Sequence, residues 1–253
     1  MTESISSLFL VSLHLDIRRS FAEAAEKRLP LRELDIGYLV HCHLKDLFGD
    51  LAPKPFFVRK QRDAFLRIVG YTNVPKDALK THADQFSQTR TFSACRWETL
   101  EDKQMPAIWK PGMVVGFETC VCPTQRMAND GLNHSKGAEV DVFLAQCWKA
   151  GSPNIPIDRE IVYRDWLNNQ FERLGGSRLK KAALVGFQRG RFCRRTQGEP
   201  RKAHRTERPE AWMKGLLEIT NSEGFLSLLK RGIGRHRAFG FGMLLLRPAN
   251  LIC

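Results

Sequence analysis

Hydrophobic and polar positions follow two different periods along the first third of the chain. Residues 7–15 open with an apolar run and then alternate, which predicts a β-strand. Residues 56–60 and 64–71 predict two more strands, joined by a short polar turn. Helical stretches are predicted between the first strand and this pair, over residues 17–28 and again after Asp35.

The helix after Asp35 has the clearest boundary signals. Asp35 is a suitable N-cap, and Gly49 lies just beyond the predicted last turn. Its apolar positions form one buried face, made of Ile36, Leu39, Val40, Leu44, Leu47 and Phe48. Residues 75–86 predict a further helix with proline near its first turn. One more strand after it would complete a split βαβ unit.

The second half repeats a mixture of strands and helices. Its predicted strands are residues 114–121, 182–192, 212–219 and 243–246, and its predicted helices are residues 158–174 and 225–229. Residues 106–111 contain two prolines and a tryptophan and suit a linker. We therefore expect an α+β protein of two tandem ferredoxin-like (RRM-like) domains, at residues 1–108 and 112–253, with a glycine-rich loop near the C-terminus.

The amount and distribution of charge indicate the kind of binding partner. The net charge is +13, and residues 178–208 contain eleven lysines or arginines against two acidic residues, which amounts to +9 in this segment. A concentrated basic segment is typical of nucleic-acid binding.

The cysteine pattern and the hydropathy argue against several classes of protein. Seven scattered cysteines argue against a secreted disulfide framework, and neither Cys120-x-Cys122 nor His41-Cys42-His43 has the spacing of a structural zinc site. The chain lacks a signal-peptide pattern and a run of eighteen apolar residues. We expect a cytoplasmic protein with no membrane segment, no metal and no cofactor.

The helix after Asp35 also carries groups capable of proton transfer. Tyr38, His41 and Lys45 lie at i, i+3 and i+7 and so share one side of the helix, whereas His43 lies roughly 200° around the axis from His41. When the ribose 2′-OH of RNA attacks the adjacent phosphorus, cleavage requires removal of the 2′-OH proton, protonation of the departing 5′ oxygen and stabilisation of the negative charge on phosphorus. A solvated helix face gives the same spacing, so both interpretations remain open.

Residues 232–246 are the most distinctive stretch of the chain. Successive backbone N–H groups in such a loop can cradle phosphate, although a turn before a core strand is the alternative. No Walker loop, nucleophile-elbow serine or carboxylate cluster for two magnesium ions is present. The loop's glycines and its potentially cationic side chains are Gly232, Gly234, Arg235, His236, Arg237, Gly240 and Gly242.

These motifs together resemble the CasE family, the CRISPR-repeat endoribonucleases of type I-E Cascade complexes. The tail is similar to the glycine-rich loop of that family, and Tyr38-Leu39-Val40-His41 matches its catalytic Tyr-x-x-His pair. Residues 116–126, which end at Arg126, look like the strand that opens its second domain. The resemblance spans nearly the whole chain.

The resemblance implies a metal-independent endoribonuclease that binds the CRISPR repeat stem-loop and cuts at its 3′ base, leaving a 2′,3′-cyclic phosphate. Such an enzyme stays on the crRNA hairpin as a Cascade subunit and meets target DNA only through the complex. His41 would be the general base or acid, with Tyr38 assisting and Lys45 or Lys136 stabilising the phosphorane; His43 and His236 are further candidates. A basic hairpin arm and the loop would bind RNA through Arg126, Lys136, Arg189, Arg191, Arg194, Arg195 and the loop residues given above.

Two alternatives remain at this level. A non-catalytic RNA-binding subunit that caps the guide RNA hairpin would share every binding feature. A DNA-binding protein that uses residues 178–208 is the other.

Overall fold

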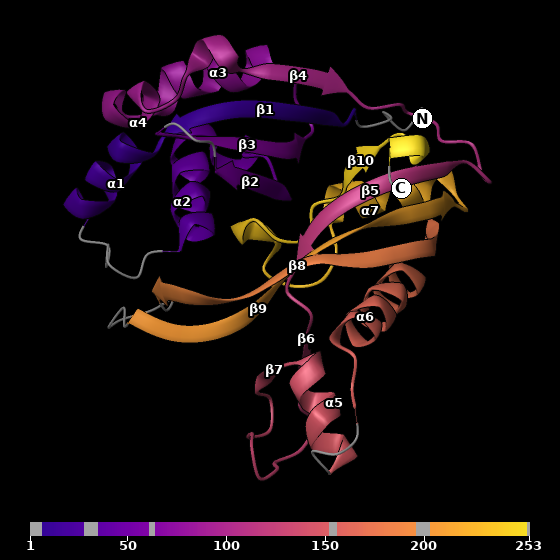
Figure 1. Ribbon diagram of the computed structural model, residues 1–253. Coiled ribbons are helices and arrows are strands. Elements are labelled where there is room, and N and C mark those ends of the chain that lie inside the picture. Colours follow the sequence, from indigo (N-terminus) through magenta and orange to yellow (C-terminus); the bar gives the residue numbers. More distant parts are fainter. Residues whose placement is uncertain (1–6, 28–34, 61–63, 152–155, 196–202, 252–253) are drawn as a thin grey trace.

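The protein is described by a computed structural model, in which two four-stranded sheets face each other (Figure 1). The structure describes residues 7–27, 35–60, 64–151, 156–195 and 203–251. All strands of one sheet precede residue 105, and all strands of the other follow residue 113.

The N-terminal sheet has the spatial order β2-β3-β1-β4, with every neighbouring pair antiparallel. Its strands are β1 (Phe9–Asp16), β2 (Phe56–Lys60), β3 (Phe65–Thr72) and β4 (Glu101–Gln104). Its helices are α1 (Ile17–Glu26), α2 (Ile36–Phe48), α3 (Lys76–Phe86) and α4 (Thr89–Ser93). The further strand that was predicted to follow residues 75–86 is β4. It pairs with the outer side of β1 and completes the ferredoxin-like unit.

The C-terminal sheet repeats this topology in the order β10-β5-β9-β8. Its strands are β5 (Val114–Val121), β8 (Ser177–Arg195), β9 (Ala203–Ile219) and β10 (Leu245–Arg247), and its helices are α6 (Arg159–Leu174) and α7 (Ser222–Arg231). Counted in chain order, both sheets have their fourth strand beside the first and the first beside the third. The tandem ferredoxin-like prediction is therefore confirmed.

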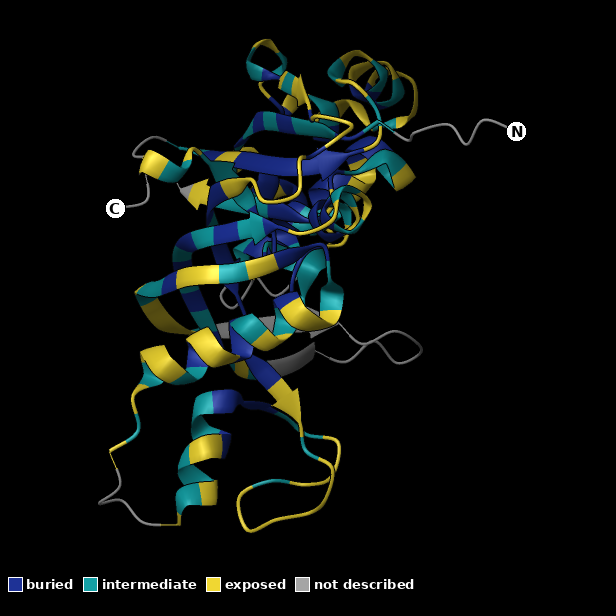
Figure 2. Ribbon diagram, turned by 90° about the vertical axis from the view of Figure 1, so that its right-hand side faces the viewer, coloured by how far each residue is buried: buried dark blue, intermediate teal, exposed yellow. Residues whose placement is uncertain are grey.

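A small lobe interrupts the second unit between β5 and α6. It consists of β6 (Thr124–Arg126), β7 (Glu139–Asp141) and α5 (Val142–Ala150), and it projects away from the main body (Figure 1). The connection from β6 to β7 is largely exposed (Figure 2). Short 3-10 helices complete the structure: η2 (Gly49–Leu51), η3 (Trp97–Thr99), η4 (Arg237–Phe239) and η5 (Ala249–Leu251).

Alternation along β1 separates the two sides of the N-terminal sheet. Val11, Leu13 and Leu15 are fully buried and belong to the same core cluster as Leu44 and Leu47 of α2. The apolar stripe of α2 therefore fixes which side of the helix is left for Tyr38 and His41.

The two units share buried contacts. The hydroxyl of Tyr71 on β3 donates a 2.9 Å hydrogen bond to the carbonyl of Leu244, and both residues are buried. At the more exposed edge of this contact, Glu118 on β5 forms an ion pair with Arg59 of β2 (2.6 Å) and a second one within its own sheet with Arg247 (3.3 Å). One core cluster includes residues of both sheets, among them Tyr71 and Phe117.

The strand predictions differ from the structure mainly in length. β8 and β9 pair from Ser177↔Ile219 to Arg195↔Ala203, so they form one long hairpin arm that begins earlier than residue 182 and extends past residue 192. The closing strand is Leu245–Arg247, and Met243 and Leu244 lie buried in the loop before it. No helix within the described ranges is long and apolar enough to cross a membrane.

Candidate active site and RNA-binding surface

Helix α2 presents Tyr38 and His41 to the glycine-rich loop. The helix begins at Asp35, whose carboxylate accepts a 3.0 Å hydrogen bond from Gly37 N, and ends at Gly49 with φ 55°. The ring of Phe239, in η4, lies 5.0 Å from the ring of His41 and 5.9 Å from the ring of Tyr38. The Tyr38 and His41 rings are 6.4 Å apart. Side chains from the first quarter and the last tenth of the chain therefore form one half-buried aromatic cluster.

Gly37 allows this close approach. A Cβ atom at this position would lie 2.8 Å from the carbonyl carbon of Phe239 and closer still to its oxygen. The glycine lies on the buried side of the first turn of α2, where the loop backbone passes directly over it. Gly37 and Phe239 were not predicted as site residues, since nothing in their local patterns indicates this contact across about 200 residues.

The glycines of the loop have a structural role in its own folding. Gly232, Gly234, Gly240 and Gly242 all have φ between 70° and 87°, a region that disfavours other residues. Ile233 N donates to Gly242 O at 2.8 Å, and Gly242 N donates to Cys120 O at 2.7 Å. These two N–H groups are therefore used within the protein. Contact of the loop with RNA stays a prediction.

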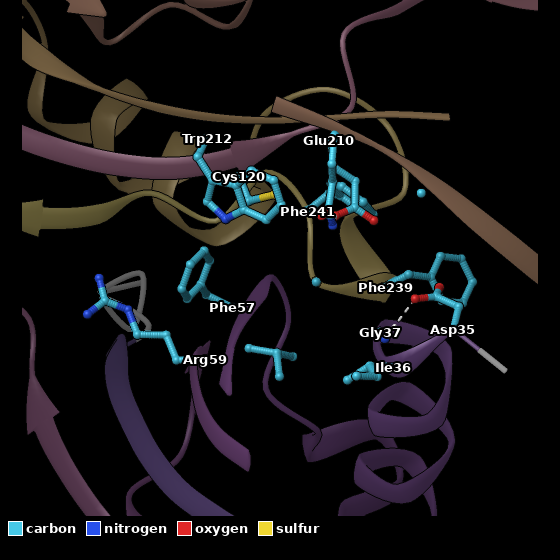
Figure 3. A pocket seen from close by; sticks show the side chains of 14 residues that line it. Asp35, Ile36, Gly37, Phe57, Arg59, Cys120, Glu210, Trp212, Phe239 and Phe241 are labelled. Carbon is cyan, nitrogen blue, oxygen red and sulfur yellow. Dashed lines mark hydrogen bonds between the residues drawn. The ribbon is translucent and has the colours of Figure 1, made fainter. Parts of the chain in front are cut away.

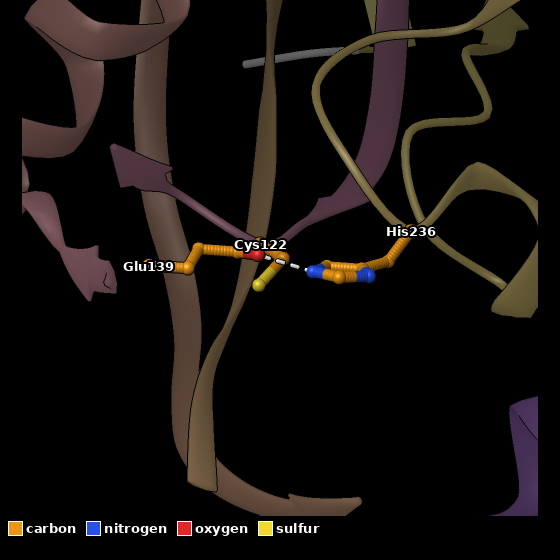
Figure 4. A group of neighbouring side chains, drawn as sticks. All are labelled: Cys122, Glu139 and His236. Carbon is orange, nitrogen blue, oxygen red and sulfur yellow. Dashed lines mark hydrogen bonds and ion pairs between the residues drawn. The ribbon is translucent and has the colours of Figure 1, made fainter. Parts of the chain in front are cut away.

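His236, within the loop, lies in a charged cluster with Glu139 (Figure 4). Its Nε2 atom is 2.7 Å from Glu139 Oε1 and 2.7 Å from a guanidinium nitrogen of Arg208, which also pairs with Glu139. Burial alone would raise the pKa of Glu139, but hydrogen bonds from His236, Arg208 and Thr124 outweigh it and hold the pKa far below its usual range. The cluster fixes the loop to β7 and β9. His236 itself has φ 60°.

The same place contains a set of potential metal ligands. Cys122, Glu139 and His236 each have one ligand atom, and these atoms lie within 4.8 Å of one another. The guanidinium of Arg208 already contacts both the carboxylate and the imidazole and so supplies the positive charge there. We therefore assign no metal ion to this cluster, and independence from metal stays a prediction.

The other histidine of α2 is internal. His43 is 3% exposed, its Nε2 is 3.2 Å from the carbonyl oxygen of Thr91, and its Nδ1 is 3.3 Å from Glu23 Oε2. Burial lowers the pKa of His43, an effect that Glu23 opposes. His41 and His43 therefore have different surroundings, and His43 connects α2 to α1 and α4.

Lys45 is exposed and directed toward a carboxylate. Its Nζ atom is 2.5 Å from Asp50 Oδ1, and both side chains are largely in solvent. The structure therefore joins Tyr38 and His41 to Phe239, and gives Lys45 a partner in η2. Its proposed role at phosphorus stays a prediction.

The predicted RNA-binding cations occupy three places. Arg126 and Lys136 are exposed on the β6–β7 lobe, and Arg189 is exposed on β8. Arg235 is exposed on the loop, whereas Arg237 donates to the carbonyl of Arg231 at 2.7 Å. Burial, with Arg231 and Arg173 nearby, lowers the pKa of Arg237. The backbones of Arg191, Arg194 and Arg195 lie in β8, but their side chains are outside the described part of the structure.

A groove of about 720 Å³ opens between the two sheets, beside the aromatic cluster of Tyr38, His41 and Phe239 (Figure 3). Phe239 and Gly37 form one end of it. Farther along, Phe57 of β2 points toward Trp212 and Phe241, which come from the C-terminal unit. These aromatic residues were not predicted as a set, because each lies in an ordinary strand or loop pattern.

Comparison with known proteins agrees with the fold. A family model described as "CRISPR associated protein" matches residues 8–248. No curated protein matches the chain. The CRISPR endoribonuclease Cse3 bound to a 19 nt RNA superposes with a TM-score of 0.63 at 17% identity, covering 95% of this chain and 100% of that one.

Two further structures are similar over nearly their whole length. Cas6e from Escherichia coli K-12 gives a TM-score of 0.58 at 16% identity, over 95% of this chain and 99% of the other. A chain of a CRISPR RNA-guided surveillance complex gives a TM-score of 0.58 at 15% identity, with the same coverage. The family match covers almost the whole sequence, so this chain belongs to the CRISPR-associated proteins and has the fold of Cse3 and Cas6e.

Proposed function

We propose that this protein is a metal-independent endoribonuclease that cuts CRISPR repeat RNA at the base of its stem-loop. The observation that carries the proposal is the contact of Tyr38 and His41 with the loop residue Phe239. Proteins of the same fold include Cse3 bound to RNA and a Thermus thermophilus Cse3 bound to an RNA that represents a pre-cleavage complex. The division into domains at residues 1–108 and 112–253 is part of the proposal.

The chemistry is an internal transfer at phosphorus. A base removes the proton of the ribose 2′-OH, the 2′ oxygen attacks the adjacent phosphorus, and the 5′ oxygen of the next nucleotide leaves with a proton from an acid. The products are a 2′,3′-cyclic phosphate and a 5′-OH. Histidine is the side chain best suited to proton transfer near neutral pH, so His41 is assigned as base or acid. Tyr38 orients it or assists the transfer, and Lys45 or Lys136 supplies positive charge.

The basic hairpin arm suits a double-stranded partner. RNA helices are recognised mostly through shape and backbone, and β8 carries exposed Arg189 along the arm. The fold also occurs in a chain of a surveillance complex. We propose that the protein keeps its product hairpin, joins such a complex in the cytoplasm, and meets target DNA only through it.

Cleavage of the repeat RNA in EDTA tests the proposal. Wild-type protein should cut at one position, and His41→Ala should cut about 10²–10⁴-fold more slowly while its affinity for RNA is unchanged. His82→Ala, another helical histidine, is the matched control and should cut normally. Tight binding by wild type without any cut would instead support a non-catalytic subunit that caps the guide RNA, and wild-type cleavage by His41→Ala would refute the assignment of His41.

A further inference from the structure

The groove between the two sheets has aromatic walls from both units. Trp212 of β9 and Phe57 of β2 are half-buried, and both pack against the buried cluster of Cys120, Cys122 and Phe241 (Figure 3). Half-buried rings that line an open groove offer apolar surface to a flat ligand. The volume of about 720 Å³ is within the range of small-molecule pockets.

The charges along the groove favour a nucleobase over a phosphate. Asp35 and Glu210 both line it, and Glu210 accepts a 2.5 Å hydrogen bond from Gln188 Nε2. Arg59, which also lines the groove, is paired with Glu118. Carboxylates repel a phosphate but accept hydrogen bonds from the N–H groups of a base. Gln188 offers the amide donor and acceptor that a base edge also uses.

The groove is continuous with the candidate active site and with the basic arm. Phe239 belongs to both the groove lining and the cluster with His41. Gln188 and Gly190 of the groove lie on β8, whose next residues form the basic arm. If the RNA backbone lies on the arm and its cleavage position lies at His41, the next unpaired base can reach this groove.

We propose that the groove is a stacking site for an unpaired nucleobase of the RNA, next to the stem that the enzyme binds. The base inserts between Phe57 and Trp212, its edge meets Glu210 and Gln188, and its phosphates remain outside on the cationic arm. This inference rests on the proposed function and adds to it the groove residues that select RNA with unpaired flanks. Stacking of a base on an aromatic side chain contributes about 1–3 kcal/mol, which corresponds to roughly 5- to 150-fold in affinity.

The test compares two RNAs with the same repeat hairpin, one bare and one carrying its unpaired flanks, each with a 2′-deoxy substitution at the cleavage position. Wild type should bind the flanked RNA about 5- to 150-fold more tightly than the bare hairpin. Trp212→Ala and Phe57→Ala should lose that difference while binding the bare hairpin as wild type does, and Trp212→Phe should retain most of it. Phe86→Ala, an exposed aromatic on α3, is the matched control and should behave as wild type.

Abasic substitutions then locate the base. Removing the base at the critical flank position should weaken RNA binding by wild type about 5- to 150-fold and leave binding by Trp212→Ala unaffected. An equal loss in both proteins, or an undiminished preference for flanks in both alanine variants, would overturn the stacking site and leave the hairpin nuclease intact. Failure of wild type to bind the bare hairpin would count against the proposed function itself.

Discussion

Gly37→Ala is the sharpest test of how the site is assembled. The new methyl group would lie 2.8 Å from the carbonyl carbon of Phe239, and this neighbour is backbone, so either η4 or the first turn of α2 must shift. Overpacking of this kind costs about 1–3 kcal/mol, whereas alanine in place of glycine within a helix recovers about 1 kcal/mol. The expected net loss in the free energy of unfolding is therefore about 0–2 kcal/mol.

The expected loss of cleavage is much larger than the loss of stability. A displacement of about 1 Å at a catalytic group can reduce the rate about 100-fold, and the shift caused by Gly37→Ala falls on the contact between His41 and Phe239. Stability is measured by urea unfolding and cleavage by single-turnover kinetics on repeat RNA. Gly186→Ala is the control, because the nearest atom to its new methyl group is a Trp212 ring carbon at an ordinary 3.5 Å.

A Gly37→Ala protein that cleaved at the wild-type rate would refute this reasoning. It would show that the contact between α2 and the loop does not position the reacting groups. A large loss of stability together with the loss of cleavage would also count against it, because unfolding would then explain both effects.

Three further outcomes are expected. Glu139→Gln should lower the stability of the protein near pH 7 and flatten the acid dependence of that stability in urea titrations. The pKa of Glu139 in the folded protein lies below its unfolded value of 4.5, so the ionised carboxylate stabilises the fold above pH 4.5. This contribution is lost as the pH falls from 4.5 through the folded pKa. Tyr71→Phe should cost about 1–2 kcal/mol in urea unfolding, because the buried carbonyl of Leu244 loses its donor. Tyr38→Phe should keep the ring packing on Phe239 and slow single-turnover cleavage; an unchanged rate would remove the Tyr38 hydroxyl from the mechanism.

Local signals predicted the elements that depend on local chemistry. The bounds of α2 follow from the Asp35 cap and from Gly49, both of which act within one turn of the helix. The strands β6 and β7 were missed because each has only three residues, too few for alternation to stand out. Helix α5 was missed because its apolar residues occur all round and give no clear stripe.

The candidate site was predictable only in part for the same reason. Tyr38 and His41 share a helix face, which spacing alone reveals. Their contact with Phe239 depends on how the two units pack, and no periodicity encodes it. The cluster of His236 with Glu139 likewise joins residues 97 positions apart.

The contact between α2 and η4 also has a consequence for the timing of synthesis. His41 leaves the ribosome about 200 residues before Phe239 and strand β10. The loop reaches its place only when Gly242 has bonded to Cys120 and β10 has paired with β5. A nascent chain therefore lacks the assembled site until the residues through β10 have emerged from the ribosome.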